Sequence, residues 1–541
     1  MRLPPHPAFD ILRFAQGEPG PARRWLVRLL LALKRPGEAR DVARALLAGK
    51  RVRARDRAAI LWGSRHTLRP LPPLPPDGDE ASLDLRVATP AEILSGGAGT
   101  AALVVLTAPG HRLVPGATTA IAEAFAADPG LFALYGDAVV LGAGGEPRLP
   151  VLRPAFDLDY LLAADYVGPV VAVRRTALDR LRLDPSLPGA EAADLLLRLA
   201  AEDPSAIRHL PRLLSTWSPA AAPPPEGWAS SRRALAERHL AGAGRVEAAG
   251  GLLTLRRDLP APPLASLVIP TRDRVELLRA CIESIRAHTD WPSLEIIVCD
   301  NDSRHPRTLA YLQRLAGEGV RVLPCPGPFN FAAMNNRAAA EANGALLVFV
   351  NNDVVAHRPD WLRRMAEEAL RPEVGAVGAK LLDVRERIQH GGIVLGTGGL
   401  VTHAHRHFSG TAPGYLASLR VTHRVSAVTA ACLAVEAEKF RAVGGFDEAA
   451  FAVDFNDVDL CLRLDAAGYR TLMVPGAVLH HHEAASRRWN PEARLRHEAE
   501  VAALRARWGE RLAADPWYHP GFDPRAGTYV RLREWAGATS R

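Results

Sequence analysis

The stretch Leu346-Leu-Val-Phe-Val-Asn-Asn-Asp353 joins five apolar residues to two amides and a carboxylate. Its apolar part shows no helical spacing and follows Gly344, which predicts a short strand buried on both faces of a sheet. In open α/β sheets, ligands bind at the carboxyl ends of the strands, so Asp353 is a candidate for a metal or phosphate site. Asp also forms ordinary turns, and this stretch alone leaves both interpretations open.

Two upstream stretches repeat the pattern of an apolar strand with a polar end. Ser266–Ile269 predicts a strand that ends at Pro270-Thr271, and Glu295–Cys299 predicts a strand that ends at Asp300. The carboxyl ends of neighbouring parallel strands lie at one edge of a sheet. We therefore expect the polar residues of all three strand ends to lie near one another.

A helix is predicted between the first two of these strands. Residues 277–285 carry apolar side chains at helical spacing, and Asp273 with Glu276 has the spacing of a capping box at the helix start. No G-x-G-x-x-G follows the first strand, and the chain has no Walker-type loop, so neither a Rossmann dinucleotide site nor a P-loop is predicted.

Length and composition indicate a globular protein of two or three domains. The chain has 541 residues, 48% of them hydrophobic, and a net charge of +8 with a pI near 9.5. The arginines are spread along the chain and no nucleic-acid module is recognisable, so nucleic acid is not an expected partner. The five cysteines are odd in number and lack zinc-site spacing, and no signal-peptide pattern follows Met1; both observations favour a cytoplasmic protein.

Proline-rich stretches and changes of pattern divide the chain into five predicted regions. We expect a basic helical segment over 1–80, an α/β module over 81–219, a linker with a helix and a hairpin over 220–263, an α/β domain over 264–490 and a helical tail over 491–541. The basic segment suits either a solvated helical face or the surface of an acidic membrane. Peripheral binding at the inner face of the membrane therefore stays open.

Six short motifs follow one another between residues 265 and 524. They are Ile269-Pro-Thr271, Val298-Cys-Asp-Asn301, Asn351-Asn-Asp353, Val443-Gly-Gly-Phe-Asp447, Phe455-Asn-Asp-Val-Asp459 and His480-His-His-Glu483. In this order they resemble the family 2 glycosyltransferases. The resemblance implies a GT-A fold, an α/β architecture with a mostly parallel central sheet flanked by helices. It also implies inverting transfer of a sugar from a nucleoside diphosphate sugar to a hydroxyl of a glycan or glycolipid, in the synthesis of cell-surface polysaccharide such as O-antigen.

The resemblance also assigns roles to individual residues. Asp353 and His481 are the expected ligands of Mn²⁺ or Mg²⁺, which stabilises a leaving diphosphate, although His480 and His482 leave the register of the histidine open. Asp457 is the expected base that takes the proton of the acceptor hydroxyl. The expected contacts of the nucleotide sugar are Pro270, Thr271, Asp300, Asn336 and Asn352.

Two positions depart from the family pattern. Asn351 stands at the first acidic position of the metal motif, which suggests one direct carboxylate contact instead of two, and Asn456 stands where the family has Glu beside the base. Asp300 and Asp457 also suit ordinary turn and helix-start roles. Gly398-Gly399 and the histidines that follow form a polar stretch that either folds over the acceptor or is a surface loop.

Two other functions remain as alternatives. A nucleotidyltransferase would also use a metal on a nucleotide-binding sheet, but the chain has no glycine- and arginine-rich triphosphate loop near Pro270. A non-catalytic glycan-binding or scaffold protein is the second alternative.

The module over 81–219 resembles a degenerate copy of the domain over 264–490. Leu103-Val-Val-Leu106 can be laid on Leu347-Val-Phe-Val350, and Asp194-Leu-Leu-Leu-Arg-Leu199 on Asp459-Leu-Cys-Leu-Arg-Leu464. The same alignments put Pro109 on Asp353, Ala192 on Asp457 and Trp217 on His481. Since none of the three replacements offers a carboxylate or an imidazole, we expect this module to be a catalytically inactive, GT-A-like unit.

Overall fold

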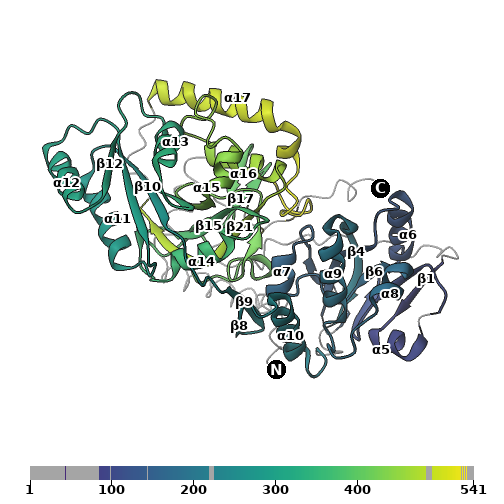
Figure 1. The fold of residues 1–541 in the computed structure, drawn as a ribbon. Helices are drawn as coiled ribbons and strands as arrows, with labels where there is room; N and C mark the ends of the chain where they lie inside the picture. The colour runs from purple at the N-terminus through teal and green to yellow at the C-terminus, as the bar shows by residue number, and fades with distance from the viewer. Residues whose placement is uncertain are drawn as a thin grey trace.

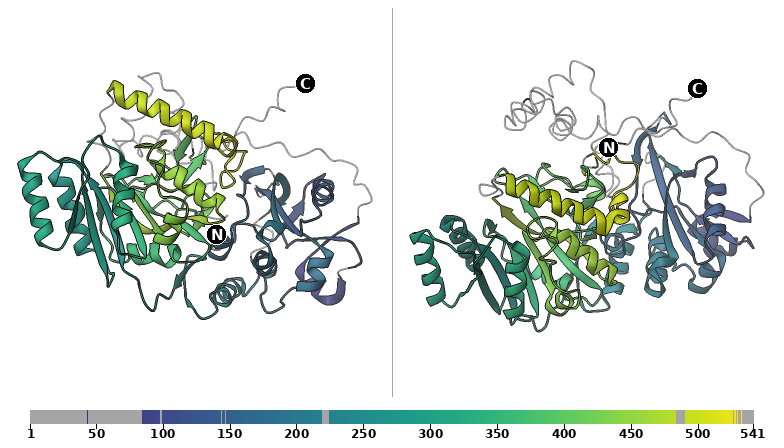
Figure 2. Two further views of the ribbon diagram at one scale, coloured as in Figure 1. Left: turned by 45° about the horizontal axis from the view of Figure 1, so that its top comes forward. Right: turned by 90° about the horizontal axis from the view of Figure 1, so that it is seen from above.

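The structure is a computed structural model that describes residues 84–525, except residues 98, 143, 146, 219–223 and 483–489, together with residues 43, 527, 529 and 532. Two lobes lie side by side in it (Figure 1), one built on residues 85–217 and the other on residues 265–481. Figure 2 shows the same separation from two further directions. The predicted basic segment over 1–80, apart from Ala43, and Glu483 of the histidine motif lie outside the described residues.

The first lobe is built on a seven-stranded sheet with the order β1-β2-β6-β4-β7-β3, in which β5 pairs with β4. Helix α6 packs on one face of this sheet, and α7, α8, α9 and α10 pack on the other. The elements in chain order are β1 (Leu85–Ala88), α5 (Pro90–Glu92), η2 (Ile93–Gly97), β2 (Leu103–Leu106), β3 (His111–Leu113), α6 (Ala117–Ala127), β4 (Ala133–Leu141), β5 (Pro147–Val151), α7 (Leu158–Ala163), β6 (Val171–Arg174), α8 (Arg175–Leu181), α9 (Glu191–Glu202), η3 (Pro204–Ala206) and β7 (Ile207–Trp217).

A helix and a hairpin connect the lobes, as the sequence predicts. Helix α10 spans Trp228–Leu240, and β8 (Gly244–Ala249) pairs antiparallel with β9 (Leu252–Arg257). The last two residues of β9 are tied to the second lobe by ion pairs. Arg256 Nη2 lies 2.7 Å from Glu367 Oε1 in a buried pair, and Arg257 Nη1 lies 3.5 Å from Glu368 Oε1.

The second lobe is built on a ten-stranded sheet with the order β12-β11-β10-β13-β20-β15-β21-β14, in which β16 pairs with β15 and β19 with β21. Its elements are β10 (Ala265–Thr271), α11 (Val275–Ala287), β11 (Leu294–Asp300), α12 (Pro306–Gly317), β12 (Arg321–Pro324), α13 (Phe331–Glu341), β13 (Leu346–Val350), β14 (Val354–Ala356), α14 (Trp361–Ala369), β15 (Val374–Leu382), β16 (Ile388–His390), β17 (Ile393–Leu395), β18 (Val401–His403), η4 (Tyr415–Ala417), β19 (His423–Arg424), β20 (Cys432–Glu436), α15 (Ala437–Ala442), α16 (Asn456–Ala466) and β21 (Arg470–His481). Strands β17 and β18 form a separate antiparallel hairpin, and α17 (Pro491–Ala513) follows the sheet.

Helices cover both faces of the second sheet. The core on one face contains side chains of α11, α12 and α14, and the core on the other contains side chains of α13, α15, α16 and α17. Every residue of β13 is buried, because both faces of this central strand are covered. Parallel pairing is confined to β12-β11-β10-β13 and to β15-β21, so the sheet is mixed, with β20 antiparallel to both of its neighbours.

The predicted capping box at the start of α11 is wrong. The residue before the helix is Arg274, in a left-handed conformation and without a side-chain cap. The carboxylate of Asp273 instead accepts hydrogen bonds from the backbone N–H groups of Arg304 and His305, at 2.9 and 2.8 Å. Asp273 therefore ties the loop after β10 to the loop after β11, because those two amides offer a tertiary alternative to the local cap.

The two sheets share one strand order. The path β2-β6-β4-β7-β3 of the first sheet has the same pair directions as the path β13-β20-β15-β21-β14 of the second. β1 stands parallel to β2 as β10 stands parallel to β13, and β5 is antiparallel to β4 as β16 is to β15. The described part of the first sheet has no counterparts of β11 and β12, the strands beyond the end of β10.

The registers agree with the alignment made from sequence to within one residue, since that alignment places His111 on Val355. Trp217 is the pairing partner of His111 at the start of β3, and His481 is the pairing partner of Val354 at the start of β14. The indole of Trp217 stacks on the ring of His111, with 5.5 Å between the centroids. An aromatic pair therefore stands in the first sheet at the place where the second sheet has His481.

The cores of the two lobes are continuous. The larger core of the first lobe includes Leu416, Ala417 and Val421 from the second lobe, and Tyr518 and Phe522 from the segment after α17. Tyr160 of α7 donates a hydrogen bond to the carbonyl of Leu416 at 2.7 Å. The lobes are therefore packed against each other and are not joined by a linker alone.

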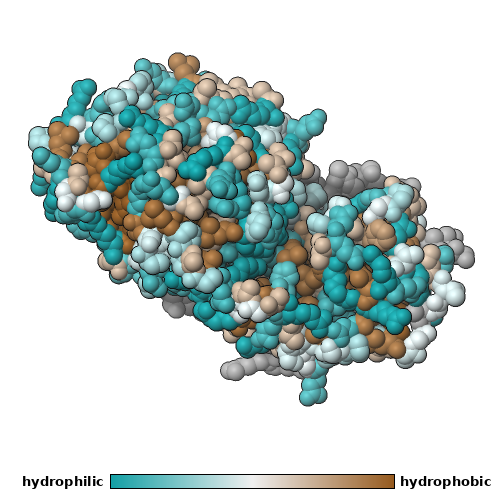
Figure 3. Space-filling view, in the orientation of Figure 1, coloured by the Kyte–Doolittle hydropathy of each residue, from teal (hydrophilic) through white to brown (hydrophobic). Residues whose placement is uncertain are grey.

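Length and hydropathy decide whether any of the described helices could span a membrane. None of the described helices is long and apolar enough to cross a membrane. On the face shown in Figure 3, hydrophilic residues cover most of both lobes and hydrophobic residues gather in separate patches.

Candidate active site at the ends of the central strands

A large cleft opens at the carboxyl ends of β10 and β13. It has a volume of about 1630 Å³ and is lined by both polar and apolar side chains. Residues from the two strand ends, from the β17–β18 hairpin, from the start of α16 and from α17 form its walls. The sequence-predicted residues among them are Pro270, Thr271, Asn352, Asp353 and Asp457.

Strand pairing brings Asp353 and His481 together. The turn Asn351-Asn352-Asp353 leads from β13 directly into the short strand β14, which pairs antiparallel with the end of β21. Val354 lies opposite His481, and the backbone N–H of His482 donates to the carbonyl of Asp353 at 3.0 Å. As a result His481 Nε2 lies 3.0 Å from Asp353 Oδ1.

The structure separates the three neighbouring histidines. His481 is buried and turned toward Asp353, whereas the ring of His480 faces the side chains of Glu386 and His357. His482 is exposed at the end of the described stretch. Successive side chains of a strand point to opposite faces, so only His481 of the three can accompany Asp353.

The hydrogen bonds of His481 leave one ring nitrogen available as a ligand. Nδ1 lies 2.7 Å from Gln389 Oε1, which accepts its proton, so the lone pair of the neutral ring is on Nε2. The amide nitrogen of Asn351 is also within 3.5 Å of Nε2. Burial raises the pKa of Asp353. When Nε2 is protonated as well, the ring donates to Asp353, and its hydrogen bond and charge outweigh burial and lower the pKa of this carboxyl.

This pair fits a divalent cation. Two ligands held at right angles at about 2.1 Å from one ion are about 3 Å apart, which agrees with the 3.0 Å between His481 Nε2 and Asp353 Oδ1. A lone pair facing a carboxylate at this distance is unfavourable unless a cation or proton lies beside both atoms. Carboxylate and imidazole are ligands that Mn²⁺ accepts, and Mg²⁺ prefers the oxygen.

Asp457 lies in the first turn of α16, on the wall of the same cleft. Its Oδ2 accepts a hydrogen bond from the backbone N–H of Ala430 at 3.1 Å, and Oδ1 accepts from that of Val458 at 2.9 Å. These bonds fix the direction of the carboxylate. Asp459, two residues on, is fully buried and bonded to Arg463, Arg507 and Trp508, so it has a structural role.

The five residues predicted to contact the donor do not all lie in the cleft. Asn352 Nδ2 donates to Thr271 Oγ1 at 2.9 Å, which joins the ends of β13 and β10. Asp300 is the pairing partner of Thr271 on the neighbouring strand, but it does not line the cleft, and its Oδ1 accepts from the N–H of Ser303. Asn336 is also outside the lining, and its amide makes two hydrogen bonds with the backbone of Phe446, each 2.8 Å long.

The residues that match a known family include the strand ends that form one side of this site. Residues 266–392 match the family model described as glycosyl transferase family 2. The chain carries a family 2 glycosyltransferase domain. Its sheet with helices on both faces is the GT-A architecture that the sequence motifs imply, although the sheet is mixed where a mostly parallel one was expected.

Two relatives of the chain are longer than the chain itself. Protein y4gI of Sinorhizobium fredii, named as uncharacterized, is 37% identical over 431 residues, which are 75% of this chain and 47% of that protein. O-antigen biosynthesis protein RfbC of Myxococcus xanthus is 36% identical over 421 residues, which are 75% of this chain and 33% of that protein. The chain therefore spans less than half of the length of these two relatives.

A solved glycosyltransferase is a more remote match. The mannosyltransferase PcManGT of Pyrobaculum calidifontis, solved with GDP-mannose and Mn²⁺, is 20% identical, with a TM-score of 0.35. The match covers 48% of this chain and 68% of that one.

The cleft of the glycosyltransferase domain contains basic residues that the sequence did not single out. Arg272 and Arg274 follow β10, Arg406 follows β18, and Arg496 and Arg505 come from α17. Such side chains suit the phosphates of a nucleotide sugar. Helix α17 was predicted from the sequence, but its position beside the cleft depends on tertiary packing. Only the excess of Arg in its sequence could have indicated that it contributes positive charge to the cleft.

In the described residues, one group of three side chains has the mutual spacing of metal ligands, and it lies outside the cleft. Asp137, His209 and His519 have ligand atoms within 4.8 Å of one another. Asp137 and His209 belong to β4 and β7 of the first sheet, and His519 follows α17. This group is too distant in the fold to take part in the chemistry of the cleft.

Proposed function

We propose that the protein transfers one sugar from a nucleoside diphosphate sugar to a hydroxyl of a glycan or glycolipid, with inversion and with help from a divalent cation. The observation that supports this most is that Asp353 and Asp457 line one cleft at the ends of the central strands, with His481 held 3.0 Å from Asp353. Such a displacement needs two ligands for the cation, here Asp353 and His481, and a separate carboxylate as base, here Asp457.

The donor is proposed to lie across the ends of β10 and β13. Thr271 and Asn352 are held together by their hydrogen bond and present a polar edge to the nucleotide sugar. Asp353 and His481 would hold Mn²⁺ or Mg²⁺, which offsets the charge that develops on the leaving diphosphate. Arg272 and Arg274 add positive charge beside the same strand end.

Asp457 is proposed to act as the base. Its carboxylate is fixed by two backbone N–H groups, and it can take the proton of the acceptor hydroxyl while that oxygen bonds to the anomeric carbon. A single displacement of this kind inverts the configuration at the anomeric carbon. The wall formed by the β17–β18 hairpin and α17 would then receive the acceptor.

The acceptor is proposed to be a component of cell-surface polysaccharide. The basis is the 36% identity to a protein named for O-antigen biosynthesis, over 75% of this chain. Such acceptors carry several hydroxyls and often a phosphate, and the arginines of the cleft suit both.

A panel of nucleotide sugars tests the proposal. The protein is incubated with each donor and Mn²⁺, with and without a panel of p-nitrophenyl glycosides, and release of nucleoside diphosphate is measured. We expect release with one donor or a few, dependent on metal and stimulated by an acceptor. The absence of release with every donor would instead favour a binding or scaffold role, and release of pyrophosphate from nucleoside triphosphates would favour nucleotidyl transfer.

We further propose that the first lobe, within the predicted region 81–219, is a degenerate GT-A-like module. The shared strand order and register support this proposal, and so do Pro109, Ala192 and Trp217 at the positions aligned with the three functional residues. None of them can bind a metal or take a proton as Asp353, Asp457 and His481 can.

A further inference from the structure

The segment after α17 lies between the first lobe and the wall of the cleft. We call its described residues between 514 and 532 the strap. Figures 1 and 2 show it (yellow) where it leaves α17 and passes between the two lobes. Its side chains Tyr518 and Phe522 are buried in the core of the first lobe.

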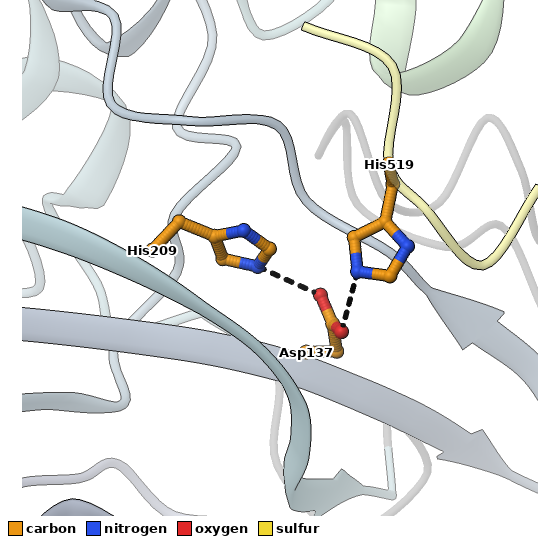
Figure 4. A group of neighbouring side chains, drawn as sticks. All are labelled: Asp137, His209 and His519. Carbon is orange, nitrogen blue, oxygen red and sulfur yellow. Dashed lines mark hydrogen bonds and ion pairs between the residues drawn. The ribbon is translucent and has the colours of Figure 1, made fainter. Parts of the chain in front are cut away.

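On the side of the first lobe, the strap is held by a buried carboxylate. Figure 4 shows His519 and His209 pointing at Asp137 from opposite sides. His519 Nε2 lies 2.9 Å from Asp137 Oδ2, and His209 Nε2 lies 3.0 Å from Asp137 Oδ1. The backbone N–H of Ala155 also donates to the carbonyl of Pro516 at 2.9 Å.

On the side of the cleft, the strap is bonded to the β17–β18 hairpin. The carboxylate of Asp515 accepts from the N–H of Leu395 at 2.7 Å, and the carbonyl of Pro524 accepts from the N–H of Gly398 at 2.9 Å. Gly527 completes the attachment, because its N–H donates to Thr402 Oγ1 at 3.2 Å and its carbonyl accepts from the N–H of His405 at 3.1 Å. Gly398, Thr402 and their neighbours line the cleft.

The group around Asp137 is better explained by hydrogen bonds than by a metal ion. His519 Nδ1 accepts from the N–H of Gly521 at 2.9 Å, so the proton of the neutral ring is on Nε2, facing Asp137. A nitrogen that carries a proton cannot coordinate a metal. Asp137 also accepts from the N–H of Arg153, whose buried guanidinium already supplies a positive charge nearby.

The charge on Asp137 agrees with this reading. Burial raises the pKa of Asp137, but the two histidines together outweigh burial and lower it to about 2. The carboxylate is therefore ionised at neutral pH. It accepts hydrogen bonds from His209 and from the N–H of Arg153, and it lies in close polar contact with His519 Nε2. Hydrogen bonds to an ionised, buried acceptor are among the stronger ones in proteins.

Backbone strain beyond the hairpin indicates that this wall of the cleft is held in place from outside. His405, Leu416 and Ala417 have positive φ values of 53°, 51° and 68°, a conformation that is costly for residues other than glycine. The contacts that hold them include the bond from Tyr160 to Leu416 and the stacking of Tyr529 on His405 at 4.6 Å. The first lobe and the strap provide these contacts.

We propose that the first lobe acts as a positioning module for the acceptor side of the cleft: Asp137, by holding His519, fixes the strap, and the strap fixes the β17–β18 hairpin. This inference rests on the proposed function in so far as it names the acceptor. Asp137 and His519 are positioning residues, since neither lines the cleft. The first lobe thus lacks the proposed catalytic groups and instead carries a carboxylate that holds the strap.

Hydrogen exchange of the complete protein, without any ligand, tests the coupling directly. In Asp137→Asn and in His519→Ala, we expect the amides of Leu395 and Gly398, which bond to the strap, to exchange about tenfold faster than in the wild type. Amides of β10 and β13 should be unchanged. Unchanged exchange of Leu395 and Gly398 in both variants would overturn the proposal.

A kinetic measurement then tests the consequence for transfer. With the donor found active in the panel and a p-nitrophenyl glycoside as acceptor, KM for the acceptor should rise about 5- to 20-fold in Asp137→Asn. KM for the donor and the rate of donor hydrolysis without acceptor should stay within about twofold. A uniform loss of all three would contradict positioning. If the wild type transfers nothing, the proposed function fails, and the exchange result still decides the coupling.

Asp194→Asn is the matched control. Asp194 is another buried carboxylate of the first lobe, and it is bonded to Arg198 and Arg238 of the same lobe and linker helix, not to the strap. It should lower the melting temperature without changing the exchange of Leu395 and Gly398. An equal effect of Asp194→Asn on those amides would show that general destabilisation is responsible. If the purified wild type contained one equivalent of zinc and Asp137→Asn contained none, the group of Asp137, His209 and His519 would be a metal site. That result would overturn the assignment of polar contacts without a metal.

Discussion

His481 Nε2 lies 3.0 Å from Asp353 Oδ1 because β14 and β21 pair in the register that sets Val354 against His481. Most of the catalytic domain lies between these two residues in sequence. The distance between Nε2 and Oδ1 is therefore set by strand pairing and not by a local turn. Strand pairing does not require a cation. A site preorganised in this way needs little movement when an ion binds.

Removal of either member of this pair should abolish the metal dependence of donor turnover. Asp353→Asn keeps the size of the side chain but removes its charge, and we expect nucleoside diphosphate release to fall at least about 100-fold, since metal ligands contribute several kcal/mol to such reactions. The measurement is the initial rate of release as a function of Mn²⁺ concentration.

His480→Ala is the matched control for His481→Ala. The two histidines are neighbours on β21, but His480 faces Glu386 and His357, away from the cleft. We expect His480→Ala to retain the metal dependence of the wild type and His481→Ala to lose it. Equal losses in the two variants would mean that the register of the metal ligand is assigned wrongly.

Asp457→Asn should stop transfer while leaving donor binding intact. A base in this position contributes about 10²- to 10⁴-fold to the rate, and Asn cannot take a proton. Isothermal titration with nucleoside diphosphate and Mn²⁺ should give an affinity within about twofold of the wild type, because Asp353 and His481 are unchanged. Transfer at the full rate by Asp457→Asn would eliminate Asp457 as the base. Residual transfer that disappears only on mutation of the first lobe would show that the first lobe is itself active.

The sequence predicted the central strand β13 well, for a physical reason. β13 spans the predicted apolar run Leu346–Val350, because a strand covered on both faces needs uninterrupted apolar residues. Asp353 and Asp457 were predicted from motifs, and both line the cleft. The roles of Asp353, His481 and Asp457 in catalysis remain predictions that the variants above will test.

Other features could not be predicted because they depend on distant contacts. Asp273 and Glu276 have capping-box spacing, but the free amides of Arg304 and His305 compete successfully for the carboxylate. Asn336 was expected to contact the donor, but in the fold its amide is bonded to the backbone of Phe446. The connection of Asp137 with His519 joins regions that nothing in the local sequence relates.

The pH dependence of stability should identify Asp137. The pKa of Asp137 is about 2 in the folded protein, against the ordinary value of 3.8 for an Asp carboxyl in the unfolded chain. Its contribution to the free energy of unfolding is therefore complete above pH 4 and is lost as the pH falls through 2. Asp137→Asn should therefore lower the free energy of unfolding by about 2 kcal/mol at pH 7. The difference from the wild type should narrow between pH 4 and pH 2.5 in urea denaturation, and a difference that grows in that range would contradict the assignment.

The contact between the lobes should depend on a buried ion cluster centred on Asp159. Asp159 Oδ1 lies 2.7 Å from Arg371 Nη1, and Oδ2 lies 2.9 Å from Arg470 Nη1, so one carboxylate of α7 neutralises two arginines of the other lobe. Asp159→Asn removes the carboxylate that joins the two arginines across the contact. Arg371 keeps Glu368 and Glu373, and Arg470 keeps Glu373, so the substitution should cost about 1.5–3 kcal/mol. Asp179→Asn, which breaks only an exposed pair with Arg175, is the control and should cost no more than about 0.5 kcal/mol. Calorimetry of the complete protein should show the Asp159 variant unfolding in two separated transitions, because the lobes lose a buried polar contact. A single transition at a lower temperature would contradict this expectation. It would mean that the shared apolar core alone makes the two lobes unfold together.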